Sequence, residues 1–207
     1  MSRLQFVQPI LDISPSIAIV GSSGNLCNHK YGKIIDQFQD VIRFNRAPTK
    51  NYEEIVGHKT TLRVANNHVF INLAPSLKGF TDQPPDFIRN LRNSRILYMG
   101  PSMEQENKEK HTHASNELFV FKFESLGDLK RAVGFVSPRP PSVGCIMICL
   151  CVIANIKPYL FGFDLNVNDS SRTHYWEDRP SLSPCHKIDY EKRFLNKLAK
   201  AGKIKIK

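Results

Sequence analysis

Two histidines near the C-terminal end of the sequence have neighbours suited to proton-transfer chemistry. His174 begins the run His-Tyr-Trp-Glu, and His186 stands five residues before Glu191. Histidine is the side chain whose unperturbed pKa, about 6.5, suits proton transfer near neutral pH. Each histidine taken alone is more often a packed or surface residue, but the two together favour an active site.

A candidate anion site precedes the histidines at residues 142–144, which read Ser-Val-Gly. Pro141 stands just before it and an apolar run from Cys145 to Ala154 follows, so a buried helix is expected to begin here. The first amides of a helix have no partner inside the helix and, with the helix dipole, attract a phosphate. An ordinary capped core helix explains the local sequence equally well.

The first strongly apolar stretch, Ile17–Leu26, ends in a polar turn that contains Gly21 and Gly24. Its apolar, largely β-branched start is typical of a strand buried on both faces, and its glycines allow a ligand to approach the backbone. In open α/β sheets, ligands bind at the carboxyl ends of the strands. A purely structural turn is the alternative for this stretch on its own.

The elements that would position these groups follow mostly in the order strand and then helix. Helical spacing predicts a helix from Tyr31 to about Gln39. Further strands are predicted at Asp40–Phe44, Thr60–Val64, Ile96–Met99, Leu118–Phe123 and Tyr159–Phe163. The strand at 118–123 alternates in polarity, so we expect it nearer an edge of the sheet.

Composition fits one soluble domain with a short lead at residues 1–16. The chain has 207 residues, 41% of them hydrophobic, and a net charge of +10 that indicates an anionic partner. Three of its five cysteines fall in one apolar run, where they are expected to act as small hydrophobes, which favours a reducing compartment. No run approaches the roughly 20 apolar residues that span a bilayer, and no signal-peptide core is present. We therefore expect either a cytoplasmic location or a truncated sequence.

Taken together, the blocks resemble the four sialylmotifs of the animal-type sialyltransferase family, in order. The large motif includes Val-Gly-Ser-Ser-Gly-Asn-Leu at 20–26 and Arg-Phe-Asn-Arg-Ala-Pro at 43–48. The other three include Pro-Ser-Val-Gly at 141–144, His-Tyr-Trp-Glu at 174–177 and His-x-x-x-x-Glu at 186–191. The large motif corresponds to 17–66 and the small motif to 141–163. One block would be weak, whereas four in order are highly specific.

The resemblance implies one glycosyltransferase domain over residues 1–207, with a Rossmann-like variant of the GT-A fold. Such a fold has a mostly parallel central sheet flanked by helices. The resemblance also implies CMP-sialic acid as the donor and a glycan or glycolipid as the acceptor, with no metal ion and no other cofactor. CMP leaves as a monophosphate that amides and a histidine could stabilise, and the sequence holds no Asp-x-Asp pair for a metal.

Site residues carry over from the family position by position. The donor-binding residues are then Ser22, Asn45, Ser142, Val143, Gly144 and Gly162. His174 would face the leaving phosphate, and His186 would be the general base for the acceptor hydroxyl in an inverting displacement. Glu191 either orients part of this site or is a surface or capping acid of a helix.

Three departures from the family pattern accompany these matches. The family's linking disulfide is missing, because Ile17 and about Asn155 stand at the cysteine positions. Ser22 replaces a common asparagine, and Val143 replaces a common serine or threonine. At Val143 one side-chain contact is in doubt, while the backbone contact is unaffected.

Other functions stay open on the sequence. A transferase for another CMP-activated acidic sugar, such as CMP-Kdo, would recognise the same carboxylate and phosphate. A non-catalytic CMP-sugar-binding homologue would fit Ser22 and Val143, but both candidate histidines are retained. Nucleic-acid binding rests on charge alone, with no aromatic-basic RNA motif, so we expect no nucleic-acid partner. The basic cluster Lys197–Lys207 fits contact with an anionic membrane equally well.

Overall fold

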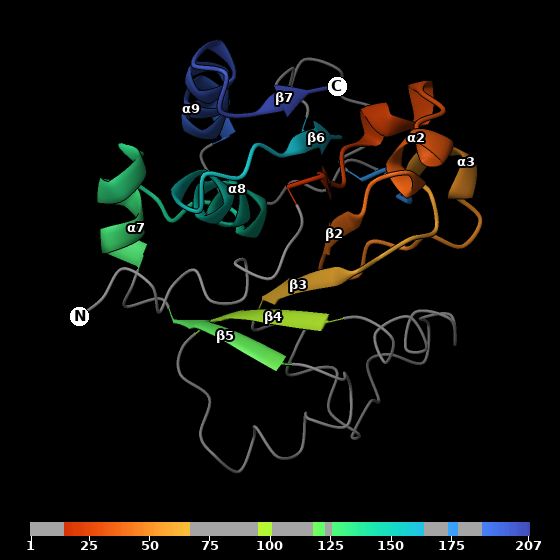
Figure 1. Cartoon of the computed structure of the whole chain (residues 1–207), viewed down its shortest axis with the longest axis horizontal. Helices are drawn as coiled ribbons and strands as arrows, with labels where there is room; N and C mark the ends of the chain where they lie inside the picture. The colour runs from red at the N-terminus through yellow and green to blue at the C-terminus, as the bar shows by residue number, and fades with distance from the viewer. Residues whose placement is uncertain (1–14, 67–94, 101–117, 123–125, 164–173, 178–187) are drawn as a thin grey trace.

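A single parallel sheet forms the centre of the protein. The computed structural model describes residues 15–66, 95–100, 118–122, 126–163, 174–177 and 188–207. Within these ranges seven strands lie in the order β5-β4-β3-β2-β1-β6-β7, and every pairing between neighbouring strands is parallel (Figure 1). The predicted α/β architecture is confirmed.

Most of the strands lie close to their predicted positions. Their bounds are β1 (Ile17–Val20), β2 (Asp40–Phe44), β3 (Leu62–Asn66), β4 (Arg95–Gly100), β5 (Leu118–Lys122), β6 (Tyr159–Phe161) and β7 (Lys205–Ile206). β3 begins and ends two residues later than expected, and β5 lies at an edge of the sheet as expected.

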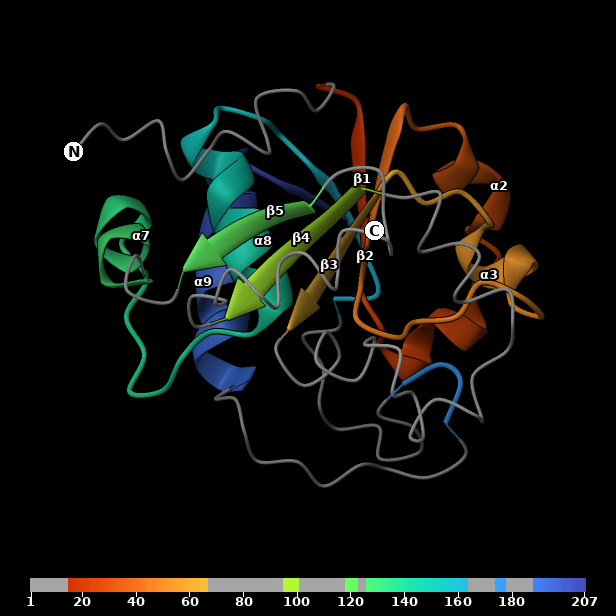
Figure 2. The same ribbon diagram turned by 90° about the horizontal axis from the view of Figure 1, so that it is seen from below.

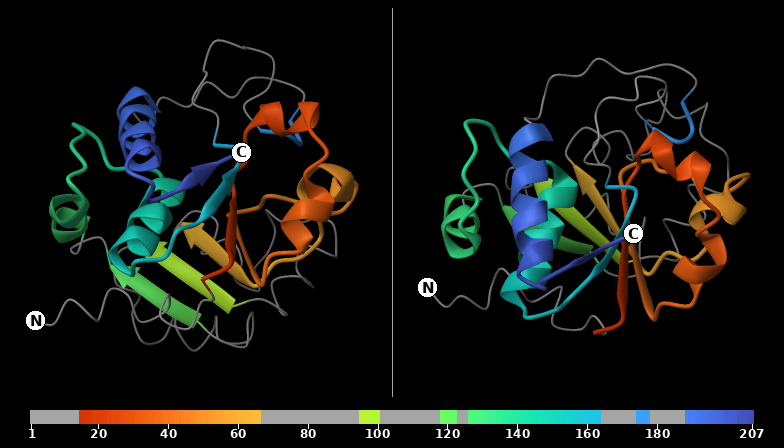
Figure 3. Two further views of the ribbon diagram at one scale, coloured as in Figure 1. Left: turned by 45° about the horizontal axis from the view of Figure 1, so that its top comes forward. Right: turned by 90° about the horizontal axis from the view of Figure 1, so that it is seen from above.

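Helices cover both faces of the sheet (Figures 2 and 3). Their bounds are η2 (Gly24–Asn28), α2 (Gly32–Asp36), α3 (Glu53–Val56), α7 (Leu126–Val133), α8 (Val143–Ile153) and α9 (Ile188–Lys200). α7, α8 and α9 lie on one face, and α2 and α3 lie on the other. None of these helices is long and apolar enough to cross a membrane.

Burial on both faces explains the continuous apolar run of β1. Ile17 and Ile19 pack in the core cluster that includes α8 and α9, whereas Ala18 and Val20 pack in the cluster that includes α2 and α3. Because successive side chains of a strand point to opposite faces, a strand covered on both sides reads as apolar at every position.

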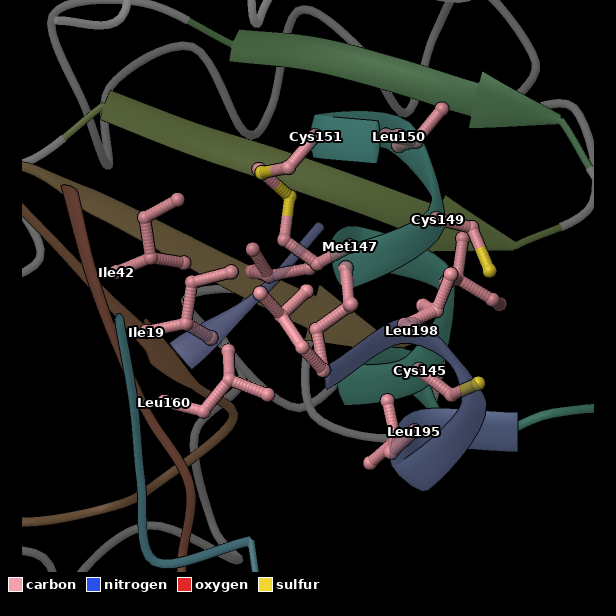
Figure 4. Close-up of a cluster of buried hydrophobic side chains, with 14 of the residues drawn as sticks. Ile19, Ile42, Cys145, Met147, Cys149, Leu150, Cys151, Leu160, Leu195 and Leu198 are labelled. Atoms are coloured by element: carbon pink, nitrogen blue, oxygen red, sulfur yellow. The ribbon is translucent and has the colours of Figure 1, made fainter. Parts of the chain in front are cut away.

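The apolar helix α8 forms the centre of the larger core cluster (Figure 4). Its cysteines Cys145, Cys149 and Cys151 are buried and free, which confirms their predicted role as small hydrophobes. Desolvation raises the pKa of the Cys151 thiol. Around the helix pack Ile19, Ile42, Leu160, Leu195 and Leu198.

Two short features differ from the sequence prediction. The helix expected from Tyr31 to Gln39 is only the five-residue α2, and Ile34, assigned to its apolar face, is 47% exposed. α3 follows β2 as a helix of four residues, too short for any apolar periodicity to indicate it.

The strand order creates a topological switch point between β1 and β6. The chain places β2 to β5 on one side of β1 and then β6 and β7 on the other. At such a point the connections leave the sheet in opposite directions, and a crevice opens at the carboxyl ends of the two strands. This edge is the location expected for a ligand.

Candidate functional site

Two glycines bring the ends of β1 and β6 into close contact. Gly21 N donates to Phe161 O at 2.7 Å, and a Cβ on Gly21 would lie 2.3 Å from Gly162 O. Gly162 has φ 66°, and a Cβ there would lie 2.5 Å from Leu26 Cδ1. The ends of the two strands therefore require glycine, and the half-buried Ser22 follows directly, so Ser22 and Gly162 lie at one edge of the sheet.

Asn45 lies at the same edge, at the end of β2. The register pairs Val20 with Arg43, so Ser22 and Asn45 each come two residues beyond that pair. Asn45 adopts the left-handed conformation with φ 45°, which asparagine tolerates better than most residues. Its backbone N–H donates to Val64 O at 2.8 Å. The structure thus places two predicted donor residues on neighbouring strand ends.

Helix α8 begins beside this edge. A Cβ on Gly144 would lie 2.9 Å from Phe163 Cε1, so glycine lets the helix start approach the residue that follows Gly162. Phe163 in turn packs edge to face against Phe44 at the end of β2, with ring centroids 6.1 Å apart. The predicted donor segment 142–144 therefore meets the ends of both β6 and β2.

Ser142 is the N-cap of α8 and is held by an acid from α9. Its Oγ accepts from Cys145 N at 3.1 Å and donates to Glu191 Oε2 at 2.6 Å, and its amide donates to Glu191 Oε1 at 2.5 Å. The following amides of Val143 and Gly144 belong to the first turn, where helix amides have no partner inside the helix. These two amides are the groups best placed to receive an anion.

The His174 segment is tied to the turn after β1. Tyr175 N donates to Ser22 O at 3.0 Å, and His174 forms an isolated antiparallel bridge with Ser23. Cys27 Sγ donates to Tyr175 O at 3.5 Å. The sequence separates the two segments by about 150 residues, yet the structure brings His174 beside the predicted donor turn.

An acid and an aromatic ring orient the His174 imidazole. Its Nδ1 lies 2.7 Å from Glu177 Oε2, and its ring stacks on Trp176 with centroids 4.6 Å apart and an interplanar angle of 19°. A carboxylate only accepts hydrogen bonds, so Nδ1 carries the proton in this contact and Nε2 is left for a ligand. The His174 and Glu177 side chains are 31% and 34% exposed, which leaves them accessible from solvent.

Three buried polar residues, whose burial the sequence analysis did not predict, pack beneath the turns that carry the site residues. Tyr175 is fully buried, its hydroxyl donates to Pro48 O, and desolvation raises its pKa. Arg43 and Arg63, paired across β2 and β3, are also buried, and desolvation lowers the pKa of each to about 10. The available signal was an arginine flanked by apolar residues in each of two strands, Arg43 in β2 and Arg63 in β3.

The two predicted catalytic residues differ in that only His174 belongs to the described part of the chain. His186 lies outside the described residues. Within the described ranges, no group of three or more His, Cys, Asp or Glu residues is placed to hold a metal ion.

Comparison with protein families gives a match over most of the chain. The model of "Glycosyltransferase family 29 (sialyltransferase)" matches residues 15–203. The match begins just before β1 and extends past α9, so it contains all the site residues described above and also His186.

Curated proteins similar to this chain include several named beta-galactoside alpha-2,6-sialyltransferase 2. The protein from Homo sapiens is 26% identical over 227 residues, which covers 95% of this chain and 41% of that protein. The one from Rattus norvegicus is 46% identical over 207 residues, covering 88% of this chain and 38% of that protein. The chain thus spans about two fifths of the length of the curated relatives it matches.

Solved structures show the same fold. A mammalian sialyltransferase in complex with Gal-beta-1-3GalNAc-ortho-nitrophenol superposes with a TM-score of 0.64 at 23% identity, covering 92% of this chain and 68% of that one. A second structure of a mammalian sialyltransferase gives the same TM-score at 22% identity.

Proposed function

The chain belongs to glycosyltransferase family 29, the sialyltransferases, and from this membership we propose that it transfers sialic acid from CMP-sialic acid to a glycan hydroxyl. One observation carries the proposal. Four segments far apart in the sequence, around Ser22, Asn45, Val143 and His174, come together at the carboxyl edge between β1 and β6. That edge is where parallel α/β sheets bind nucleotides.

The donor phosphate would be held by backbone amides and a histidine. The Val143 and Gly144 amides lie at the positive end of α8, where an anion is favoured. His174, oriented by Glu177, would present Nε2 to the leaving phosphate and stabilise the charge that develops as CMP departs. These groups can supply the charge stabilisation by themselves, so we propose transfer without a metal ion.

The acceptor reaction follows from the retained histidine pattern. His186 would act as general base on the acceptor hydroxyl, which then attacks the anomeric carbon from the face opposite CMP and inverts its configuration. The C–O bond to the CMP phosphate breaks as the new glycosidic bond forms, and the hydroxyl proton passes to His186. A β-galactoside glycan or glycolipid is the first acceptor to test, because the curated relatives are named for it.

One incubation tests donor, acceptor and metal dependence together. The protein is mixed with CMP-Neu5Ac or CMP-Kdo and a panel of β-galactosides, with and without EDTA. We expect CMP release and a sialylated product from CMP-Neu5Ac, at the same rate with EDTA. Transfer from CMP-Kdo instead would reassign the donor. Loss of activity in EDTA would refute metal independence, and binding of CMP without transfer would indicate a non-catalytic homologue.

The cytoplasmic location is not addressed by this incubation and stays a prediction from the sequence.

A further inference from the structure

Arg63 occupies an unusual position for a charged residue. It is the second residue of β3, is 1% exposed, and lies directly opposite the buried Arg43 of β2. Desolvation and the Arg43 charge lower the pKa of Arg63 to about 10, which still leaves it protonated at neutral pH. Burying two cations side by side opposes folding unless their hydrogen bonds compensate for the lost solvation.

Two hydrogen bonds of Arg63 reach the turn at residues 45–47. Its Nη1 donates to Asn45 O at 3.0 Å and to Ala47 O at 3.2 Å. The same turn is bound to β3 by its backbone, because Asn45 N donates to Val64 O. Two consecutive residues of β3, Arg63 and Val64, therefore hold the carbonyl and the amide of Asn45.

The partners of Arg43 lie elsewhere, although the two arginines are neighbours. Arg43 Nε donates to Lys59 O and Thr60 Oγ1, and its Nη2 donates to Val56 O at 2.5 Å. These acceptors belong to the end of α3 and the loop before β3. Of the two buried guanidiniums, Arg63 is thus the one directed at the turn that carries Asn45.

The turn needs such support because Asn45 has a left-handed backbone, which is less favourable than the extended or helical conformations. Hydrogen bonds from a charged donor to carbonyls are stronger in a buried setting than those from a neutral donor. Fixing the carbonyls of residues 45 and 47 also fixes the direction in which the Asn45 side chain leaves the turn.

We propose that Arg63 is a positioning residue of the donor site, whose two hydrogen bonds to the 45–47 turn hold the Asn45 side chain where it meets the CMP-sugar. The inference rests on the proposed function, which makes Asn45 a donor contact. Arg63 itself does not touch the donor. Its effect on binding is exerted through the turn.

The first experiment compares affinity for CMP-3-fluoro-sialic acid, a non-transferable donor analogue, by calorimetry. Arg63→Lys keeps the charge but loses the planar fork, and we expect its dissociation constant to rise about tenfold or more. Val41→Ala is the matched control, because Val41 is fully buried in the cluster on the same face and its apolar side chain can donate no hydrogen bond to the turn. It should melt at a lower temperature and bind within about twofold of the wild type.

A double-mutant cycle separates positioning from a general structural role. Asn45→Ala removes the side chain that Arg63 is proposed to aim, so Arg63→Lys in that background should change affinity by less than about twofold. The same tenfold loss in both backgrounds would overturn the inference. Wild-type affinity in Arg63→Lys itself would do so as well.

Arg63→Gln provides a second variant if Arg63→Lys does not fold. It removes the repulsion with Arg43 and keeps one amide donor for the two carbonyls, so it should fold and still bind the analogue weakly. Normal affinity in folded Arg63→Gln would refute the role of Arg63. If the wild type itself failed to bind the analogue, the proposed donor would be wrong, and this inference would fall with it.

Discussion

The carboxylate of Glu191 accepts both polar hydrogens of Ser142, with Oε1 2.5 Å from the amide and Oε2 2.6 Å from the hydroxyl. The two residues are 49 positions apart, with Glu191 in the first turn of α9 and Ser142 at the N-cap of α8. Of the roles left open for Glu191, the structure supports that of a capping acid, although it caps α8 and not its own helix. It does so at a segment predicted to bind the donor.

Glu191→Ala should weaken both folding and donor binding. It leaves the amide and hydroxyl of Ser142 without their acceptor, so we expect the free energy of unfolding to fall by about 1–3 kcal/mol. The KM for CMP-sialic acid should rise, because the first turn of α8 is no longer fixed. Chemical denaturation and donor kinetics measure the two effects.

Asp189→Ala is the control for Glu191→Ala. Asp189 is an exposed acid in the same first turn of α9, so its loss removes the same charge without touching Ser142. Its free energy of unfolding should stay within about 0.5 kcal/mol of the wild type. Equal losses in the two variants would show that the charge near α9, and not the Ser142 contact, stabilises the protein.

The parts of the fold that the sequence predicts well are those with a strong local pattern. β1 and α8 are apolar at almost every position, and each follows closely after a proline, Pro15 or Pro141, so both their type and their burial follow from the residues. That Ser22, Asn45 and Gly162 share one edge then follows from topology, because strand ends in a parallel sheet meet at the same edge, whereas their predicted role in donor binding came from the family resemblance.

The parts that it does not predict depend on contacts between distant segments. α2 and α3 are too short for periodicity to indicate their length. The burial of Arg43 and Arg63 depends on the register of β2 against β3 and on carbonyls from loops, and neither is encoded locally. The contact of Glu191 with Ser142 likewise depends on how α9 packs beside α8.

Gly21→Ala should disrupt the edge at which the site is built. The new Cβ would lie 2.3 Å from Gly162 O, a backbone atom, so the ends of β1 and β6 would have to separate. We expect a loss of about 1–3 kcal/mol in stability, as for other overpacked sites, and weaker binding of CMP as Ser22 moves. Thermal melting and calorimetry measure the two effects.

Gly127→Ala is the matched control for the glycine variant. Gly127 lies in α7, and the nearest atom to a Cβ there is Arg131 Nη1 at 3.5 Å, the mobile end of a side chain. Alanine should leave CMP binding unchanged and raise stability by up to about 1 kcal/mol, because it favours the helix. If Gly21→Ala behaved like Gly127→Ala, the close approach of the two strands would not be required.

Glu177→Ala should reduce turnover more than it affects donor affinity. Without the carboxylate, His174 loses the partner that fixes its ring and tautomer, so we expect kcat to fall about tenfold or more. In His174→Ala, which removes the imidazole itself, kcat should fall about 100- to 10,000-fold. Glu54→Ala is the control, because the Glu54 carboxylate pairs with Lys30 at the surface and is 77% exposed. Unchanged kcat in His174→Ala would remove this histidine from the mechanism.

His186→Ala tests the proposed general base. Loss of the base should lower the transfer rate by about 100- to 10,000-fold while leaving the affinity for CMP near that of the wild type. Steady-state transfer to a β-galactoside and calorimetry with CMP measure the two quantities. Near-normal turnover would assign deprotonation of the acceptor to another group.

Tyr175→Phe should reveal the buried phenol through the dependence of stability on pH. The variant loses the hydrogen bond to Pro48 O, so near pH 8 it should be less stable than the wild type by about 0.5–1.5 kcal/mol. Desolvation raises the pKa of Tyr175 in the folded protein, whereas in the unfolded chain the phenol ionises near its ordinary value of about 10. Above that pH the unfolded wild type releases a proton that the folded state retains, so the wild type's advantage in stability should shrink by about 1.4 kcal/mol per pH unit.

Urea unfolding of both proteins from pH 8 to 11 measures this difference in stability. The contributions of Arg43 and Arg63 are common to both proteins and cancel to first order. A difference that stays constant across pH 10 would mean that Tyr175 ionises equally easily in the folded protein, contrary to its burial.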